Sequence, residues 1–119
     1  MAKTNIKISS VPYYTVIFDI FRTGIGSGAF SLTERFNNSP FDNAEFISSY
    51  NSTGSYYVDT PVEQFKIFAH TAFIDATEVR VGVGTGLSAY PTTIFINNEI
   101  SGTPTDATMQ GVLFITILP

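Results

Sequence analysis

The segment YYTVIFDIF, residues 13–21, decides the fold class of this chain. Its even-numbered side chains are all apolar, while its odd-numbered side chains include Thr15 and Asp19. Side chains point alternately to the two faces of a β-strand, whereas an amphipathic helix repeats its apolar positions every three or four residues. The segment therefore predicts a strand with one buried face and one face that is half polar.

Three other segments also have the character of strands. Residues 65–73 alternate a row that is apolar apart from Thr71 with a mixed set, and residues 79–84 alternate three valines with one arginine and two glycines. Residues 112–118, VLFITIL, are apolar on both faces apart from Thr116. A strand of that composition is typical of the middle of a sheet that is covered on both sides.

The segments between these strands contain turn residues. Asn97 and Asn98 predict a two-residue hairpin turn, because asparagine tolerates the positive φ angles that such turns require. The sequence NSTG at residues 51–54 predicts a second turn. The spacing GIGSGA at residues 24–29 resembles a dinucleotide-binding loop, but the helix that this chemistry needs is missing, so we interpret it as a turn between strands. Leu32 to Asn38 is the best helix candidate, although two turns of helix are marginally stable.

Turn signals at intervals of roughly 8–12 residues are typical of all-β proteins built from two sheets. The sequence predicts a single antiparallel β-sandwich, jelly-roll-like, with about eight strands. A chain of 119 residues is too short for a second core, so residues 1–119 are expected to form one domain. The alternation predicts a core built from the following side chains: Val16, Phe18, Ile20, Phe65, Ile67, Phe73, Val79, Val81, Ile94, Ile96, Phe114 and Leu118.

The composition excludes several kinds of chemistry. The chain has no cysteine, a single histidine, and only six lysines and arginines in a net charge of −4. These numbers argue against disulfides, thiolate metal sites, most zinc chemistry and a nucleic-acid footprint. No nucleophile, base and orienting group stand at a recognised spacing, and His70 is best interpreted as a strand residue rather than a metal ligand. We therefore expect a protein that is not an enzyme and has no cofactor.

No targeting segment or membrane span is visible in the sequence. The basic residues near Met1 are not followed by the apolar run of a signal peptide, and no stretch approaches the ~18 apolar residues of a spanning helix. The expectation is a protein made in the cytoplasm.

The main functional hypothesis is a structural assembly protein. Charged residues make up 13% of the chain, about half of the ~25% found in ordinary soluble domains, although a small monomer needs charge to stay soluble. Much of the surface should therefore be covered by other chains. The composition favours a virion component, such as a bacteriophage capsid, cement (decoration) or fibre-head subunit. The expected partners are copies of the chain itself, with a trimer favoured by analogy, and other structural proteins. The predicted subunit interface consists of Phe68, His70, Arg80, Gly82 and Gly84.

The alternative hypothesis is a lectin-like module that binds carbohydrate. Exposed tyrosines can stack on sugar rings, and in a regular strand one ring of the adjacent pair Tyr56 and Tyr57 must point outward. Asn51 and Asp59 lie close by in the sequence and could bond sugar hydroxyls.

Overall fold

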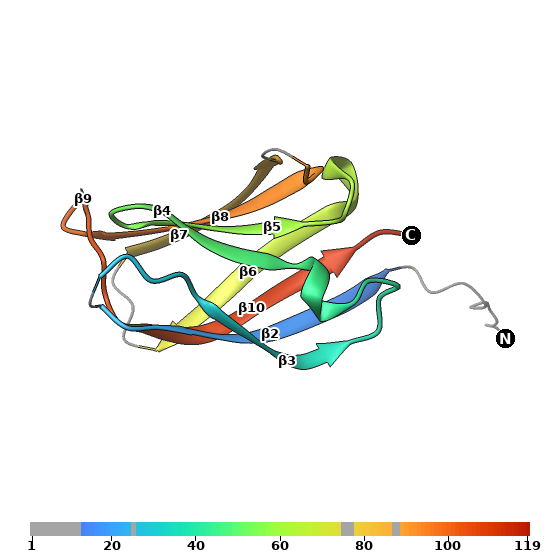
Figure 1. Ribbon diagram of the computed structural model, residues 1–119, viewed down its shortest axis with the longest axis horizontal. Coiled ribbons are helices and arrows are strands. Elements are labelled where there is room, and N and C mark those ends of the chain that lie inside the picture. The colour runs from blue at the N-terminus through green and yellow to red at the C-terminus, as the bar shows by residue number, and fades with distance from the viewer. Residues whose placement is uncertain (1–12, 25, 75–77, 87–88) are drawn as a thin grey trace, which may run out of the picture.

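The computed structural model describes residues 13–24, 26–74, 78–86 and 89–119, and these residues form two antiparallel sheets packed against each other (Figure 1). One sheet, which we call the front sheet and which lies lower in Figure 1, has the order β3-β2-β10-β6. It is made of β3 (Ser31–Asn37), β2 (Tyr14–Arg22), β10 (Met109–Ile117) and β6 (Ile67–Ile74). The back sheet has the order β4-β5-β8-β7, made of β4 (Ile47–Ser52), β5 (Ser55–Thr60), β8 (Thr92–Ile100) and β7 (Glu78–Thr85), and β9 (Thr103–Pro104) pairs with β8. Two short 3-10 turns, η1 (Asn43–Glu45) and η2 (Gln64–Lys66), complete the described elements. The predicted all-β sandwich is confirmed.

β10 holds the front sheet together, because it pairs with β2 on one side and β6 on the other. The prediction that residues 112–118 form a central strand is therefore confirmed. Leu113, Ile115 and Ile117 are buried between the sheets. Within the chain, the strand is covered on one face only, because Val112 and Phe114 lie half-buried on the outer face and no described segment packs over them.

Side chains from both sheets fill the core. Six predicted core residues are buried: Val16, Phe18, Ile20, Ile67, Ile94 and Ile96. Phe73, Val79 and Val81 are partly buried and pack against this cluster.

Three residues predicted for the core lie elsewhere. Phe65 is 90% exposed, since the strand begins only at Ile67 and Phe65 belongs to the preceding 3-10 turn. Phe114 points outward, and Leu118 is 37% exposed beyond the end of β10. The sequence around β10 is apolar on both faces, so its alternation could not show which face is buried.

The candidate helix at Leu32 to Asn38 is instead strand β3, so this prediction is wrong. It pairs with β2 through a register shift between Ile17 and Phe18. A ladder of strand hydrogen bonds outweighs the weak helix preference of so short a segment.

The predicted hairpin turn at Asn97 and Asn98 is also wrong, because both residues lie inside the continuous strand β8. Asn98 is buried, and its backbone N–H donates to the Gly54 carbonyl at 2.7 Å. The turn comes later, where Ser101 and Gly102 have φ angles of 51° and 79°. The turn predicted at residues 51–54 is confirmed and uses Gly54 at a φ of 71°.

Candidate functional site

The structure divides the predicted interface residues between two surfaces. Phe68 and His70 lie on β6, on the outer face of the front sheet, which we call the front face. Arg80, Gly82 and Gly84 lie on β7, on the outer face of the back sheet, which we call the back face. The predicted residues are therefore divided between the two outer faces of the sandwich, at the edge where β6 and β7 contact each other.

The front face carries several large apolar side chains that are partly open to solvent, interspersed with polar ones. Phe21, Phe36, Phe68 and Ile74 are 43%, 47%, 59% and 63% exposed. The strand register joins these positions across the half-buried centre of the sheet, as in the row from Phe36 through Ile17 and Phe114 to His70. The His70 ring stacks on Phe114, with ring centroids 4.8 Å apart.

Charge on the front face is neutralised locally. Arg35 donates two hydrogen bonds to the Asp19 carboxylate, the shorter at 2.7 Å. Both side chains are substantially exposed, so the pair contributes little to stability. It does leave the face without a net charge at this point, so a second apolar surface could approach without burying an unpaired ion.

On the back face, neighbouring aromatic rings shield each other from solvent. Tyr57 and Phe95 meet edge to face with centroids 5.2 Å apart. The Phe95 ring also lies over Gly84, where an added Cβ would come within 2.6 Å of a ring carbon. The missing Cβ at Gly84 therefore leaves room for an aromatic ring of the same chain. The space above Gly82 is open.

The predicted carbohydrate contacts do not form a shared site. Tyr56 is fully buried in the core, which corrects its assignment as an exposed stacking ring. Asp59 is also buried, where it accepts a 2.7 Å hydrogen bond from the Thr93 hydroxyl. Tyr57 and Asn51 remain accessible, but a strand of alternating side chains cannot present Tyr56 on the same face as its neighbour.

One end of the sandwich is closed by a buried polar cluster, which we call the closed end. Arg22 is only 2% exposed, and its guanidinium donates to the carbonyls of Gly26, Gly28 and Ala107. Its central carbon lies 4.6 Å from the ring centroid of Tyr56. One side chain therefore joins the loop after β2 to the loop before β10.

Asp106 completes the closed end. Its carboxylate accepts hydrogen bonds of 2.8 Å from the Tyr50 hydroxyl, the Tyr56 hydroxyl and the Gly54 amide. Burial by itself would raise the pKa of Asp106, but these three donors and the Arg22 charge outweigh it and lower the pKa. Burial and the bond to Asp106 raise the pKa of Tyr56. The cluster satisfies its own groups, so it is a structural feature of the fold.

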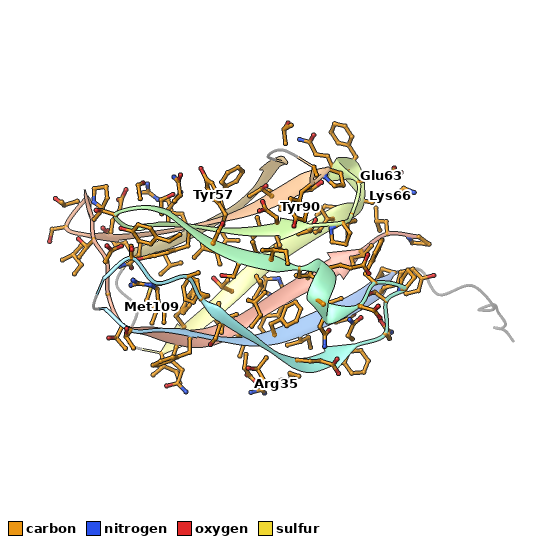
Figure 2. The ribbon with its side chains drawn as sticks, in the orientation of Figure 1. Arg35, Tyr57, Glu63, Lys66, Tyr90 and Met109 are labelled. Atoms are coloured by element: carbon orange, nitrogen blue, oxygen red, sulfur yellow. The ribbon has the colours of Figure 1, made fainter. Side chains whose placement is uncertain are left out.

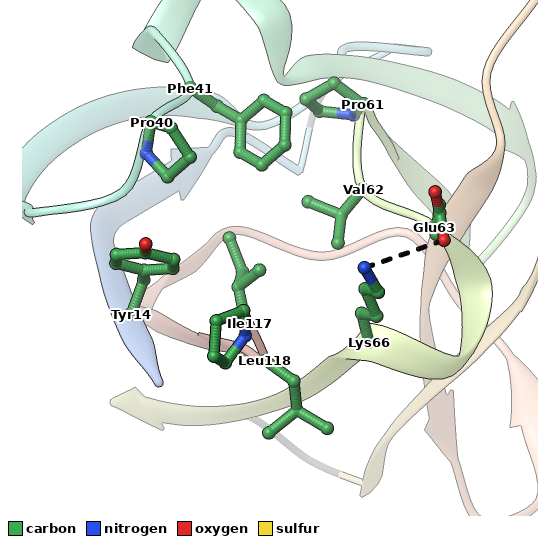
Figure 3. A pocket seen from close by; sticks show the side chains of 10 residues that line it. Tyr14, Pro40, Phe41, Pro61, Val62, Glu63, Lys66, Ile117 and Leu118 are labelled. Carbon is green, nitrogen blue, oxygen red and sulfur yellow. Dashed lines mark ion pairs between the residues drawn. The ribbon is translucent and has the colours of Figure 1, made fainter. Parts of the chain in front are cut away.

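The opposite end of the sandwich holds an open pocket of about 450 Å³, which we call the end pocket (Figure 3). Tyr14 lies at the start of β2, and Ile117 at the end of β10 is followed by Leu118 and Pro119 in the pocket wall. The other walls come from the loop after β3, with Pro40 and Phe41, and from the segment around η2, with Pro61, Val62, Glu63 and Lys66. Most of the lining is apolar, including Tyr14, Phe41, Pro61, Val62, Ile117 and Leu118. Such a pocket has the size and apolar character of a binding site.

Two charged residues lie at the rim of the end pocket. The Lys66 ammonium is 3.8 Å from the Glu63 carboxylate, and the two side chains are 46% and 76% exposed. Figure 2 shows both at the end of the molecule opposite Met109. Phe65 lies between them in the sequence and is the most exposed large apolar side chain among the described residues. Sequence periodicity missed this feature because it placed Phe65 in a strand.

The described residues contain no group of three or more histidines, aspartates and glutamates placed to hold a metal ion. No helix formed by these residues has the length and hydrophobicity that crossing a bilayer requires. Comparison with known proteins found no matching family model, curated protein or solved structure.

Proposed function

We propose that this chain is a non-enzymatic structural subunit that assembles with copies of itself through the front face. The observation that carries the proposal is the set of exposed apolar side chains on that face: Phe21, Phe36, Phe68 and Ile74. An apolar sheet face is stabilised when a second layer covers it, and no described segment of this chain lies over it.

The area involved supports an interface. Phe21, Phe36 and Phe68 together leave roughly 300 Å² of aromatic side chain exposed, taking about 200 Å² for a whole ring side chain. The largest apolar patch on a typical monomer is ~300–600 Å² and is often a functional surface, and this face falls within that range. Ile74 and the half-buried Ile17, Val112 and Phe114 enlarge the patch further. The front face therefore has the apolar centre that a protein interface needs.

The two outer faces differ in a way that selects the front one. Tyr57 and Phe95 cover each other on the back face, whereas Phe68 and Ile74 face solvent. Association through the front face would thus remove the larger unshielded apolar surface from water. A virion subunit remains the specific role that the composition favours, and a trimer remains the closed form favoured by analogy.

A matched pair of substitutions tests the proposal. Ile74→Ser removes a 63% exposed isoleucine from the front face, and Ile100→Ser removes a 43% exposed isoleucine from the back sheet. Native mass and sedimentation velocity over a concentration series should show assembly for the wild type and the Ile100 variant. The Ile74 variant should assemble at least about tenfold more weakly, because a buried isoleucine contributes about 1.5–3 kcal/mol. Equal assembly of both variants, or a wild type that stays monomeric, would overturn the proposal.

A further inference from the structure

We propose a second self-association site at the pocket end of the sandwich, in which Phe65 of one copy inserts into the end pocket of another. Phe65 is 90% exposed, so nearly the whole ring side chain is available to a partner. A fully exposed phenylalanine is costly in water, and its burial would contribute about as much as a core side chain. The contact is separate from the front face and does not depend on it.

The pocket has room for the ring. Its volume of about 450 Å³ exceeds the ~150 Å³ cavity that holds a benzene molecule. The phenyl ring of a chain's own Phe65 does not line its own pocket, although its neighbours Glu63 and Lys66 do. A second copy can therefore occupy the pocket without displacing any of the described residues of the first.

The nearness of ring and pocket in one chain points to a reciprocal contact. In a two-fold dimer every contact occurs twice, with the roles of the two subunits exchanged. The Phe65 ring of each copy can therefore enter the end pocket of the other. The rim charges fit the same arrangement. Glu63 and Lys66 are separated by 3.8 Å, longer than the ~2.7–2.9 Å of a charge-assisted hydrogen bond. Each can pair with the opposite charge of the second copy across a two-fold axis.

The buried area sets the strength of this contact. Two rings and two sets of pocket walls would bury roughly 800 Å² in total, below the ~1,200–2,000 Å² of stable interfaces. The end contact is therefore expected to be weak alone. Together with the front face it would give each subunit two different contact surfaces, which an extended assembly requires.

A tryptophan reporter tests the contact directly. The chain has no tryptophan, so Phe65→Trp places the only indole at the exposed position and keeps an aromatic ring there. The measurement is made in an Ile74→Ser background, so that front-face assembly does not interfere. Emission should shift to shorter wavelength as protein concentration rises into the high-micromolar range, because the indole becomes buried in the partner's pocket.

Blocking the pocket should abolish this shift. Leu118 lies at the pocket and is 37% exposed, so Leu118→Arg places a charge in the path of the ring without burying it in the core. Ile100→Arg is the matched control on the back sheet, at 43% exposure, and should leave the shift unchanged. A shift that survives Leu118→Arg, or an emission that never shifts with concentration, would overturn the proposal.

A mixing experiment checks reciprocity. Phe65→Ala leaves the pocket without a ring, and Leu118→Arg leaves the ring without a pocket, so each variant alone should sediment as a monomer in the Ile74→Ser background. A mixture restores one of the two ring-and-pocket contacts, so a heterodimer should form in sedimentation velocity at higher protein concentrations than the two-contact dimer needs, because only half of the contact area is buried. A mixture that remains entirely monomeric would contradict the contact. None of these outcomes decides the front-face proposal, which the Ile74 and Ile100 variants test separately.

Discussion

The two ends of this sandwich differ in structure, although the same strands, β2 and β10, run between them: one end is closed by polar side chains and the other is an open apolar pocket. At the closed end, Arg22 and Asp106 satisfy loop carbonyls, an amide and two tyrosine hydroxyls within the chain. At the pocket end, apolar walls surround an open volume and Phe65 faces water. The comparison indicates that the closed end contributes to the stability of the fold, while the pocket end is available for contacts with another molecule.

Replacing one basic residue by methionine at each end should give the largest difference in unfolding free energy. Arg22→Met keeps the apolar stem beside Tyr56 but leaves three loop carbonyls without their donor, so it should cost about 3–5 kcal/mol of unfolding free energy. Lys66→Met removes a charge from a loose, exposed pair and should change stability by less than about 0.5 kcal/mol. Urea unfolding of both variants measures the difference. Comparable losses of unfolding free energy would show that both ends stabilise the fold to a similar extent.

Asp106 should give the closed end a sensitivity to acid. Its folded pKa lies below the ordinary value of 3.8, so its contribution to stability is present above that value and is lost as the pH falls through the folded pKa. Asp106→Asn should cost about 1–3 kcal/mol at neutral pH, because three donors lose a charged acceptor. The variant should also lose less further stability below pH 3.8 than the wild type. Parallel acid unfolding curves would contradict this role.

Tyr56 should give the same end a sensitivity to alkali. Its folded pKa is raised above the ordinary value of 10.0, so its contribution is present below pH 10.0 and is lost as the pH rises further. Tyr56→Phe keeps the buried ring and removes the hydroxyl, at a cost of about 1 kcal/mol near neutral pH. Above pH 10.0, the midpoint temperature of thermal unfolding should therefore fall less steeply with pH for the variant than for the wild type. Tyr50→Phe is the natural control, since Tyr50 donates to the same carboxylate from a less buried position.

The strands could be predicted from the sequence, because alternation is a local property. The face of β2 that carries Val16, Phe18 and Ile20 is buried as expected. For β10 the alternation could not show which face is buried, since both of its faces are apolar. Phe114 was therefore predicted in the core, whereas it lies on the outer face. The correct face depends on which neighbours the strand acquires in the sheet, and those neighbours are distant in the sequence.

The closed end could not be predicted for the same reason. Arg22 is buried at the end of a strand, and its contact with Ala107 joins residues 85 positions apart. An arginine is normally a solvated residue, and only the fold brings the distant Ala107 carbonyl to Arg22 beside the nearby carbonyls of Gly26 and Gly28. The front face was partly anticipated through Phe68 and His70, but the strand register was needed to show that Arg80 and Gly82 lie on the other side.

The smallest expected effect on stability belongs to Phe65, and it tests whether the pocket end is free of a structural role. A side chain that is 90% exposed makes few contacts within its own chain, so Phe65→Ser should change the unfolding free energy by no more than about 0.5 kcal/mol. The same variant should weaken self-association through the end pocket, because the inserted ring is lost. A reference is Phe73→Ser, which truncates a half-buried ring that packs against Phe30 at a centroid distance of 5.9 Å, and it should destabilise the fold clearly. If Phe65→Ser proves as destabilising as Phe73→Ser, the ring is packed within its own chain, and the contrast between a stabilising end and a contact end fails.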